Sequence, residues 1–411
     1  MRVVEAAMLN ESDNKRVFFI NSTCGTGSTG RIVTGLMGVL TSYGYTCMAA
    51  YGRGKAPEGY ETYRIGSDFD VDFHGVCSRI TDRHGFYSRG ATRRLIQKIE
   101  EFNPDIIHLH NLHGYYLNIG ILFHYLKKSE RKVIWTLHDC WSFTGHCTHF
   151  EYIGCTKWQT GCFRCDQLGE YPKSVLCDAS TSNYKAKKEL FTGLPNMVLV
   201  TPSEWLKGKI KLSYMKDYEV TVVPTGIDLS QFYPLESDLR EKHNLGDSYV
   251  VLGAANPWRE RKGLYEFAKV AKSLNHRYRI VLIGLNEKQM AELPPEIIAL
   301  PRTDSVEEMA KWYSTADVYV NLTLEDTFPT TNIEALACGT PVVTYRAGGS
   351  PESIDSTCGM IVERSNLSGV TAAIDRMKDG GDKKEACLRR ASMYSSEKRF
   401  TEYYEKVYAK L

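Results

Sequence analysis

The sequence of 411 residues has no apolar run near the roughly 18 to 20 residues that a membrane-spanning helix needs. Its opening stretch, MRVVEAAMLNESDNKR, lacks the hydrophobic segment of a signal peptide, which favours a cytoplasmic location. Neither charge is in excess, with 51 Lys and Arg against 49 Asp and Glu, so the composition does not indicate a nucleic-acid partner. What remains is an ordinary globular composition in a chain long enough for two domains.

Strand-like runs rich in β-branched residues recur along the chain, separated by longer amphipathic stretches typical of helices. This alternation predicts two doubly wound, Rossmann-like α/β domains that face a central cleft. The pattern restarts after VVPTGID, so we place the domains at 1–224 and 225–391 and a closing helix at 392–411 that packs back on the first domain. Residues 1–15 are predicted to be a polar extension, either disordered or an artefact of the chosen start. The strand-like runs are VFFI at Val17, DIIHL at Asp105, KVIWTL at Lys132, MVLVTPS at Met197, YVVLGAA at Tyr249, RIVLIG at Arg279, DVYVNL at Asp317, PVVTY at Pro341 and GMIVE at Gly359.

The most informative stretch is LEDTFPTTNIEALACGTPVVTY at 324–345, which follows a predicted strand. Thr331 or Asn332 can cap a helix, and a short helix is expected over 333–338. Its unpaired N–H groups and positive dipole end would suit a diphosphate. Glu334, at the helix start, either stabilises the helix dipole or accepts hydrogen bonds from a diol such as ribose.

This stretch resembles the family-4 glycosyltransferases of the GT-B fold, in which two acidic residues with seven between them precede EALACGTPVV or a close variant. The second acid of that family binds the donor ribose, and the resemblance gives this role to Glu334. The first acid, normally a Glu at the donor sugar, corresponds by spacing to Asp326, while Glu325 lies one residue earlier. The resemblance therefore leaves two candidates for the first acid, Asp326 and Glu325.

Three more loops resemble donor-binding loops of the same family. In NPWRERKG the resemblance places Lys262 at the donor diphosphate, where a cation stabilises the departing charge. Either Arg259 or Arg261 would supply a second cation, and the alternative is a solvated run of charges. For AGGSPES the alternative is a plain turn. The remaining residues expected at the donor are Gly27 and Ser28 of GTGSTGR, the helix-start residues Thr330, Thr331 and Asn332, and Gly348, Gly349 and Glu352 of AGGSPES.

Two predicted strands end in polar residues, HLHN and TLHD, which we expect to point into the cleft. The resemblance makes His138 an active-site histidine near the donor sugar, which orients groups or handles a proton. His110 and Asp139 are expected on the acceptor side. For His108 and His110, a hydrogen-bonded core histidine is at least as good an interpretation as a functional one.

A cysteine-rich insertion is predicted at 140–177, after TLHD. Cys147, Cys155, Cys162 and Cys165 could hold a structural Zn²⁺, with His146 and His149 as substitutes, whereas reduced thiols or disulfides are the alternatives. Catalysis is not expected to require a metal or another cofactor. DFDVD at Asp68 is interpreted as a loop, so the sequence has no convincing DxD motif at a strand end, which disfavours a manganese-dependent, single-domain glycosyltransferase.

The resemblance implies a retaining enzyme that moves a hexose from a UDP- or GDP-sugar to a sugar hydroxyl. The runs TLHDCWSFTGHC and EDTFPTTNIEALACG are most similar to bacterial capsule, exopolysaccharide and colanic-acid-type glycosyltransferases. That similarity implies an oligosaccharide acceptor, lipid-linked at the inner membrane face. The basic segment KGKIKLSYMK at 207–216 would give peripheral membrane contact, or is a solvated face. A non-catalytic sugar-nucleotide-binding subunit and a sugar-nucleotide epimerase are the alternatives.

Overall fold

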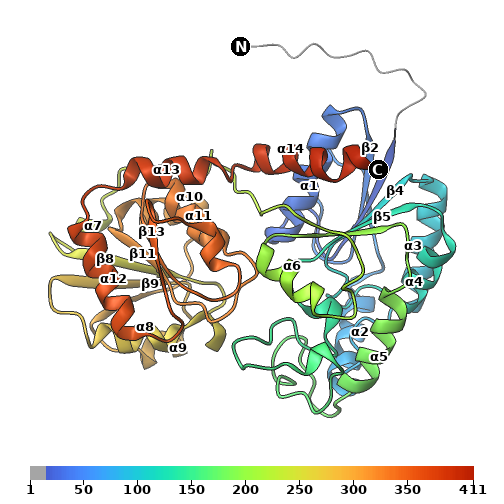
Figure 1. The fold of residues 1–411 in the computed structure, drawn as a ribbon, viewed down its shortest axis with the longest axis horizontal. Helices are drawn as coiled ribbons and strands as arrows, with labels where there is room; N and C mark the ends of the chain where they lie inside the picture. Colours follow the sequence, from blue (N-terminus) through green and yellow to red (C-terminus); the bar gives the residue numbers. More distant parts are fainter. Residues whose placement is uncertain (1–14) are drawn as a thin grey trace.

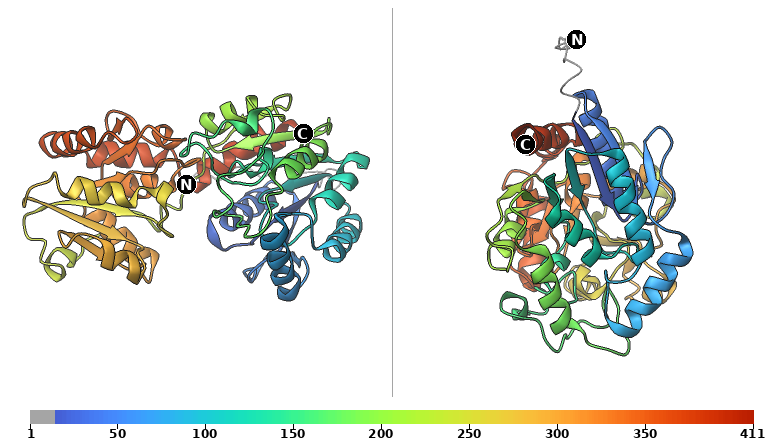
Figure 2. Two further views of the ribbon diagram at one scale, coloured as in Figure 1. Left: turned by 90° about the horizontal axis from the view of Figure 1, so that it is seen from below. Right: turned by 90° about the vertical axis from the view of Figure 1, so that its right-hand side faces the viewer.

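The buried β-branched runs form two separate parallel sheets, one in each half of the chain (Figure 1). This is a computed structural model, and it describes residues 15–411. The predicted extension at 1–15 lies outside the described residues except for its last residue, Lys15. The expectation of two Rossmann-like domains is confirmed, and Figure 2 shows them side by side along the long axis.

The N-terminal sheet has the strand order β3-β2-β1-β4-β5-β6-β7, with every neighbouring pair parallel. Its inner strand β1 is buried from Val17 onward, as expected for a strand covered by helices on both faces. The strands are β1 (Arg16–Asn21), β2 (Thr46–Tyr51), β3 (Thr62–Arg64), β4 (Ile106–Leu109), β5 (Lys132–Thr136), β6 (Met197–Thr201) and β7 (Val220–Val222). The helices are α1 (Gly27–Ser42), α2 (Asp68–Thr81), α3 (Arg89–Phe102), α4 (Ile119–Lys128), α5 (Ser180–Phe191) and α6 (Glu204–Lys211).

The C-terminal sheet has the order β10-β9-β8-β11-β12-β13 and is also parallel throughout. Apolar clusters pack on both of its faces. The strands are β8 (Tyr249–Ala254), β9 (Tyr278–Ile283), β10 (Ile297–Leu300), β11 (Val318–Asn321), β12 (Val342–Tyr345) and β13 (Gly359–Val362). The helices are α7 (Leu239–Lys242), α8 (Leu264–Ala271), α9 (Glu287–Glu292), α10 (Val306–Thr315), α11 (Thr330–Ala337), α12 (Leu367–Asp379) and α13 (Lys384–Ser392).

The last helix, α14 (Ser396–Lys406), leaves the C-terminal domain and packs on α1 of the N-terminal domain (Figure 1). A Cβ at Gly35 of α1 would lie 2.2 Å from the Phe400 ring, so the glycine permits this close approach. The Tyr408 hydroxyl lies 2.5 Å from Nδ1 of His108 in the buried core. The expectation that His108 points into the cleft is therefore wrong, because its ring fills the space under the returning helix.

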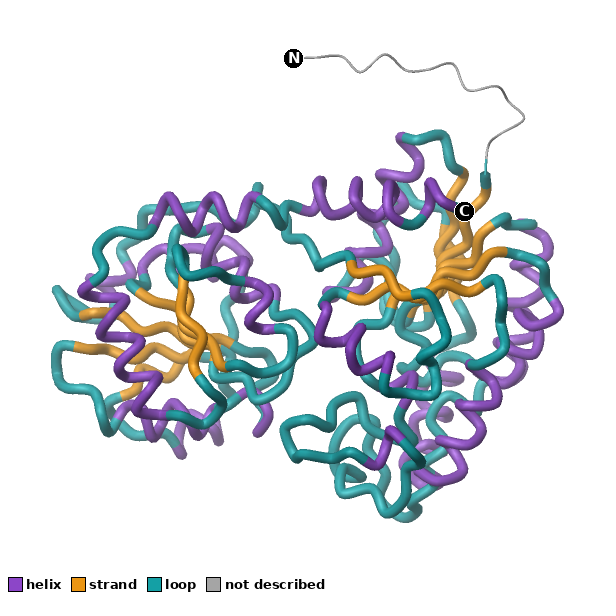
Figure 3. The backbone as a smooth tube through the Cα atoms, viewed as in Figure 1, coloured by secondary structure: helices purple, strands orange, loops and turns teal. Residues whose placement is uncertain are grey.

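The cysteine-rich insertion (residues 140–177) lies below the N-terminal sheet and consists mostly of loops (Figure 3). Its regular structure is limited to two 3₁₀ turns, Trp141–Phe143 and Lys157–Gln159. The rings of Phe143, Phe150 and Trp158 pack against one another inside it.

The interpretation of DFDVD as a loop is wrong, since these residues begin α2. Ser67 accepts a hydrogen bond from the Asp70 N–H, and the Asp70 carboxylate accepts one from the Ser67 N–H. This reciprocal capping box explains why a helix begins at this acidic run. Over residues 15–411, no helix has both the length and the apolar character to cross a bilayer.

A candidate donor site between the domains

The two domains meet through hydrogen bonds between loops that follow their strands. The Thr327 hydroxyl, after β11, donates to the backbone oxygen of His138, after β5, at 2.9 Å. Glu352 accepts the backbone N–H groups of Glu204 and Trp205, at 2.8 Å each, at the start of α6. The carboxyl ends of parallel strands are where such folds bind ligands, so the candidate site lies at this junction.

Lys262 and Asp326 form the charged centre of the C-terminal side. The Lys262 Nζ lies 2.5 Å from the Asp326 carboxylate, and both side chains are largely buried. Burial raises the pKa of Asp326, but the charges of Lys262 and Arg261 outweigh it and hold that pKa at about 2. Asp326 is therefore ionised at neutral pH and holds the lysine in position.

Arg261 lies with this pair, whereas Arg259 does not. The Arg261 guanidinium is 4.0 Å from the Asp326 carboxylate and donates to the backbone oxygen of Glu325 at 3.0 Å. Arg259 is exposed and instead pairs with Glu170 of the cysteine-rich insertion at 3.1 Å. Of the two arginines left open by the sequence, the geometry favours Arg261 as the second cation.

Glu334 lies in the second turn of α11, not at its start. The helix begins three residues earlier than expected, with Pro329 rather than Thr331 or Asn332 at the N-cap. The Glu334 carboxylate accepts a hydrogen bond from the Tyr313 hydroxyl at 3.0 Å. Burial raises its pKa, and hydrogen bonds from Tyr313 and Thr330 and the charge of Arg31 partly oppose that rise.

The first turn of α11 divides its three polar residues between two environments. Thr330 and Thr331 are half-buried, next to Glu334 and Tyr319 respectively. Asn332 is fully buried, and its amide donates to Ser353 at 2.9 Å. The Asn332 side chain therefore braces the domain interior, and its backbone N–H already donates to the Pro329 oxygen at 3.2 Å.

Glu325 and Asp326 point in opposite directions. The Glu325 carboxylate, which is fully buried, accepts three backbone N–H groups of the insertion, from Phe150 at 3.1 Å, Glu151 at 2.7 Å and Tyr152 at 3.1 Å. Burial raises the pKa of Glu325 to about 7 against the lowering effect of these bonds. Glu325 thus joins the domains, while Asp326 lies with the cations.

The loop after β12 is pressed against the backbone of Asp326. Gly348 has φ of +59°, and a Cβ there would lie 1.9 Å from the Asp326 carbonyl oxygen. The Gly349 N–H donates to that same oxygen at 2.8 Å. Both glycines therefore set the position of Asp326. Glu352, also expected at the donor, uses both carboxylate oxygens on α6.

On the N-terminal side, Gly27 and Ser28 are the exposed first residues of α1, after the N-cap Thr26. Their N–H groups belong to the first turn, which has no partners within the helix. Arg31, one turn along, is close enough to Glu334 to lower its pKa. The N-terminus of α1 and the second turn of α11 therefore lie across the junction from each other.

The polar residues after β4 and β5 form a connected group. The Nε2 of His138 lies 3.0 Å from Nδ1 of His110, and burial lowers the pKa of His138 to about 4, so this ring is neutral at pH 7. Asp139 pairs with Nε2 of His113 at 2.7 Å, and the Tyr171 hydroxyl lies 3.1 Å from Nδ1 of the same ring. His113 is absent from the sequence prediction, although HLHNLH repeats the residue type three positions after His110.

His149 of the insertion is a second residue that the sequence reasoning missed as a site residue. Burial, followed by the charge of Arg261, lowers its pKa to about 3, and Asp139, Asp326 and Lys262 also lie near enough to affect it. Its Nδ1 lies 2.9 Å from the Thr148 hydroxyl. Nothing in the sequence besides the histidine itself indicates this position, and the pattern around it suggests a substitute zinc ligand instead.

All twelve cysteines are free thiols. In the described part of the chain, no three His, Cys, Asp or Glu side chains are gathered closely enough, as they stand, to hold a metal ion. The four cysteines expected to bind zinc therefore do not form a preassembled metal site in the described residues.

A separate cavity of about 500 Å³ lies at the opposite end of the C-terminal domain, before β11 and β12, where its lining includes Glu236, Asp317 and Lys384. It is at the amino ends of the strands, so we do not assign the donor to it.

Comparison with known proteins supports the fold and finds a family match within the C-terminal domain. Residues 248–379 match the family model for Glycosyl transferases group 1. The chain is 24% identical over 294 residues to the putative colanic acid biosynthesis glycosyl transferase WcaC of Escherichia coli K12, covering 64% of this chain and 65% of that protein. It is 27% identical over 230 residues to the D-inositol 3-phosphate glycosyltransferase of Pseudarthrobacter chlorophenolicus, covering 50% of this chain and 54% of that protein. These matches span less than two thirds of either relative.

Solved structures resemble the whole chain. The sucrose-phosphate synthase of Thermosynechococcus elongatus aligns with a TM-score of 0.69 at 15% identity, over 97% of this chain and 100% of that one. The Anabaena protein Alr3699/HepE, crystallised with UDP-glucose, aligns with a TM-score of 0.65 at 13% identity, over 96% and 99%. At these identities the likeness establishes the two-domain fold.

Proposed function

We propose that this chain, a GT-B glycosyltransferase of the family-4 type with its group 1 domain at 248–379, transfers a hexose from a nucleoside-diphosphate sugar to a hydroxyl of a sugar acceptor. The observation that carries the proposal is that Lys262 and Arg261 pair with Asp326 just before the start of α11, the helix that carries Glu334, at the domain junction. Cations and free N–H groups would bind the diphosphate, and Glu334 would accept the ribose hydroxyls.

The chemistry follows from the charges. As the bond between the anomeric carbon and the β-phosphate oxygen breaks, the departing diphosphate gains negative charge, which Lys262 and Arg261 would stabilise. The acceptor oxygen forms the new bond to the anomeric carbon and gives up its proton to the departing phosphate oxygen. His138, neutral at pH 7, could orient the sugar through hydrogen bonds. Retention of the anomeric configuration is part of the proposal.

The donor and acceptor classes rest on relatives. A structural neighbour binds UDP-glucose, and one sequence relative is named a GDP-mannose-dependent mannosyltransferase, so we propose a UDP- or GDP-sugar. Similarity to WcaC favours an oligosaccharide acceptor of a bacterial surface polysaccharide. A lipid-linked acceptor would bring the protein to the inner membrane face by peripheral contact.

A thermal-shift screen of UDP-, GDP- and ADP-sugars tests the donor site, because a ligand that binds only the folded state raises its melting temperature. One nucleotide class should stabilise the wild type, and Glu334→Ala should abolish that shift. Glu287→Ala is the matched control, since Glu287 is an exposed acid in the first turn of α9. An unchanged shift in Glu334→Ala would contradict the assignment.

Incubation with a labelled donor then tests the activity. Transfer to an oligosaccharide, or slow hydrolysis, is expected of a glycosyltransferase. Binding with no turnover would make the protein a sugar-nucleotide-binding subunit. Conversion of the donor into an isomeric sugar nucleotide with the acceptor omitted would make it an epimerase.

A further inference from the structure

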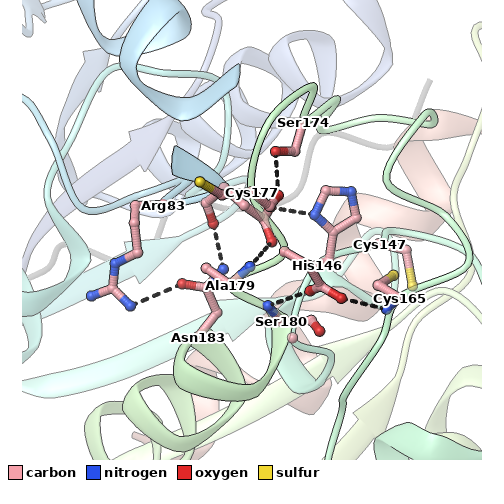
Figure 4. A network of polar contacts seen from close by, with 12 residues as sticks. Arg83, His146, Cys147, Cys165, Ser174, Cys177, Ala179, Ser180 and Asn183 are labelled. Carbon is pink, nitrogen blue, oxygen red and sulfur yellow. Dashed lines mark hydrogen bonds and ion pairs between the residues drawn. The ribbon is translucent and has the colours of Figure 1, made fainter. Parts of the chain in front are cut away.

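Four cysteines of the insertion line one small cavity. Cys147, Cys155, Cys162 and Cys165 all contribute to its wall, and its volume of about 20 Å³ suits one water molecule or one ion. Figure 4 shows the thiols of Cys147 and Cys165 side by side, while Cys177, in the same insertion, points elsewhere. Four thiols around a space of this size are a donor set for a soft metal ion.

Hydrogen bonds already support two of these sulfur atoms. Cys162 accepts the Gly145 N–H at 3.1 Å, and Cys165 accepts the Gln167 N–H. The Cys147 thiol also donates to Cys165. Backbone N–H groups aimed at sulfur stabilise a thiolate and orient it, as the outer partners of metal ligands do.

A second, independent observation comes from His146, which also lines the cavity. Its Nδ1 lies 2.5 Å from the Asp82 carboxylate, which fixes the ring. Its Nε2 is buried and has no hydrogen-bond partner in the described part of the protein. A buried polar atom without a partner is costly, so this nitrogen adds a further potential donor atom to the cavity wall, although the four-thiol shell proposed below does not use it.

The backbone between these ligands is held by loop contacts and ring packing, with little regular structure. The insertion is tied to its domain by Asp82, which pairs with His146, and by Asp178, which accepts the Cys165 N–H at 2.8 Å (Figure 4). Between Cys147 and Cys165 the regular structure is a single 3₁₀ turn. A bound metal would add a restraint to these loops.

We propose that Cys147, Cys155, Cys162 and Cys165 bind one Zn²⁺ ion as thiolates, releasing their protons to solvent. Four protein ligands close the tetrahedral shell, so the ion is structural and leaves no position for a substrate. The sulfur atoms surround the cavity without converging within 15–411, so zinc would draw the thiols inward.

The site has a consequence for the domain junction. Residues 150–152, whose N–H groups bind Glu325, lie between the ligands Cys147 and Cys155. Phe150 also lines the cavity. Zinc would therefore fix the segment that receives Glu325 from the other domain, and it would hold His149 beside the donor cations.

Elemental analysis of the full-length protein, purified without chelators, tests the zinc site. We expect about one zinc per chain in the wild type, X-ray absorption from a shell of four sulfur atoms, and loss of zinc in a Cys162→Ser, Cys165→Ser double variant. Cys177→Ser is the matched control, because Cys177 is exposed and does not line the cavity. It should keep its zinc.

Hydrogen exchange tests the link to the junction. Amides of residues 150–152 should exchange faster after zinc removal in the wild type and in Cys177→Ser. The measurement on wild type stands even if the double variant fails to fold. Absence of zinc, a Cys147–Cys165 disulfide in the purified protein, a shell of nitrogen and oxygen, or unchanged exchange at 150–152 would overturn the proposal. No sugar nucleotide is used, so failure of the proposed transferase activity would leave these results intact.

Discussion

The Nζ of Lys262 lies 2.5 Å from the carboxylate of Asp326, and the two residues come from loops that follow neighbouring strands, β8 and β11. The carboxylate neutralises and positions the cation that we assign to the donor diphosphate. Since Arg261 stands 4.0 Å from the same carboxylate, two cations share one acid, and a positive charge remains for a phosphate.

Lys262→Met should weaken binding of the donor nucleotide by about tenfold to a hundredfold. A hydrogen bond to a charged group is worth about 1.5–3 kcal/mol, which corresponds to that change in Kd. Titration calorimetry with the nucleotide found in the screen measures it. Lys311→Met is the control, because Lys311 is a partly exposed lysine paired with Glu307 on α10, away from the donor site. Equal affinities for the two variants would contradict the assignment.

The low pKa of Asp326 predicts a specific loss of stability in acid. Its pKa is about 2 in the folded protein against an ordinary 3.8, so its contribution is complete above about pH 4 and is lost as pH falls through 2. Between pH 5 and pH 3 the free energy of unfolding should fall by about 1 kcal/mol more in the wild type than in Asp326→Asn. Urea unfolding at the two pH values measures it. Lys262→Met should also reduce this pH dependence, since it removes the charge that lowers the pKa, and identical slopes in all three proteins would refute the pairing.

Glu325→Gln should loosen the contact between the insertion and the C-terminal domain. The carboxylate has two oxygens for three backbone N–H groups, whereas the amide of glutamine keeps one acceptor oxygen and brings two donors. Leaving buried N–H groups unpaired should lower the free energy of unfolding by about 1–3 kcal/mol. Amides 150–152 should exchange faster, with Glu287→Gln as an exposed control. Unchanged exchange would mean that Glu325 does not hold this segment.

His149→Ala should lower the rate of sugar transfer by about tenfold or more, because the ring lies among the charged residues that we assign to the donor site. The melting temperature should stay close to that of the wild type. His124→Ala serves as the control, because His124 is an exposed histidine on α4. Steady-state kinetics measure the effect. A kcat equal to that of the wild type would show that His149 has no role in the reaction.

Tyr408→Phe should destabilise the docking of the C-terminal segment. The change deletes a buried hydroxyl that lies 2.5 Å from Nδ1 of His108 and leaves that nitrogen unpaired, at a cost of about 1–3 kcal/mol. Tyr404→Phe should cost less, because Tyr404 contacts Tyr43 by ring stacking, with centroids 3.8 Å apart. Chemical denaturation of both variants gives the comparison. Equal losses would show that the hydrogen bond contributes nothing specific.

The hydrophobic periodicity of the sequence, together with the residues that end helices and strands, was enough to predict the architecture. Buried runs such as VFFI and RIVLIG, separated by helical stretches, are typical of strands covered on both faces, so the sequence predicted two parallel sheets. It missed β2, because TCMAAY offers small residues in place of a β-branched run. It also misread DFDVD, since the capping box depends on Ser67, just before the acidic run.

Chain order alone places Lys262, Asp326 and Glu334 in loops and a helix that follow strands. Which of the two neighbouring acids has which partner depends on how the domains pack. Glu325 and Asp326 are adjacent in sequence, but one meets backbone N–H groups of the insertion and the other meets Lys262. The reason is that hydrogen-bond partners 174 and 64 residues away are set by how the domains pack, which no local pattern encodes.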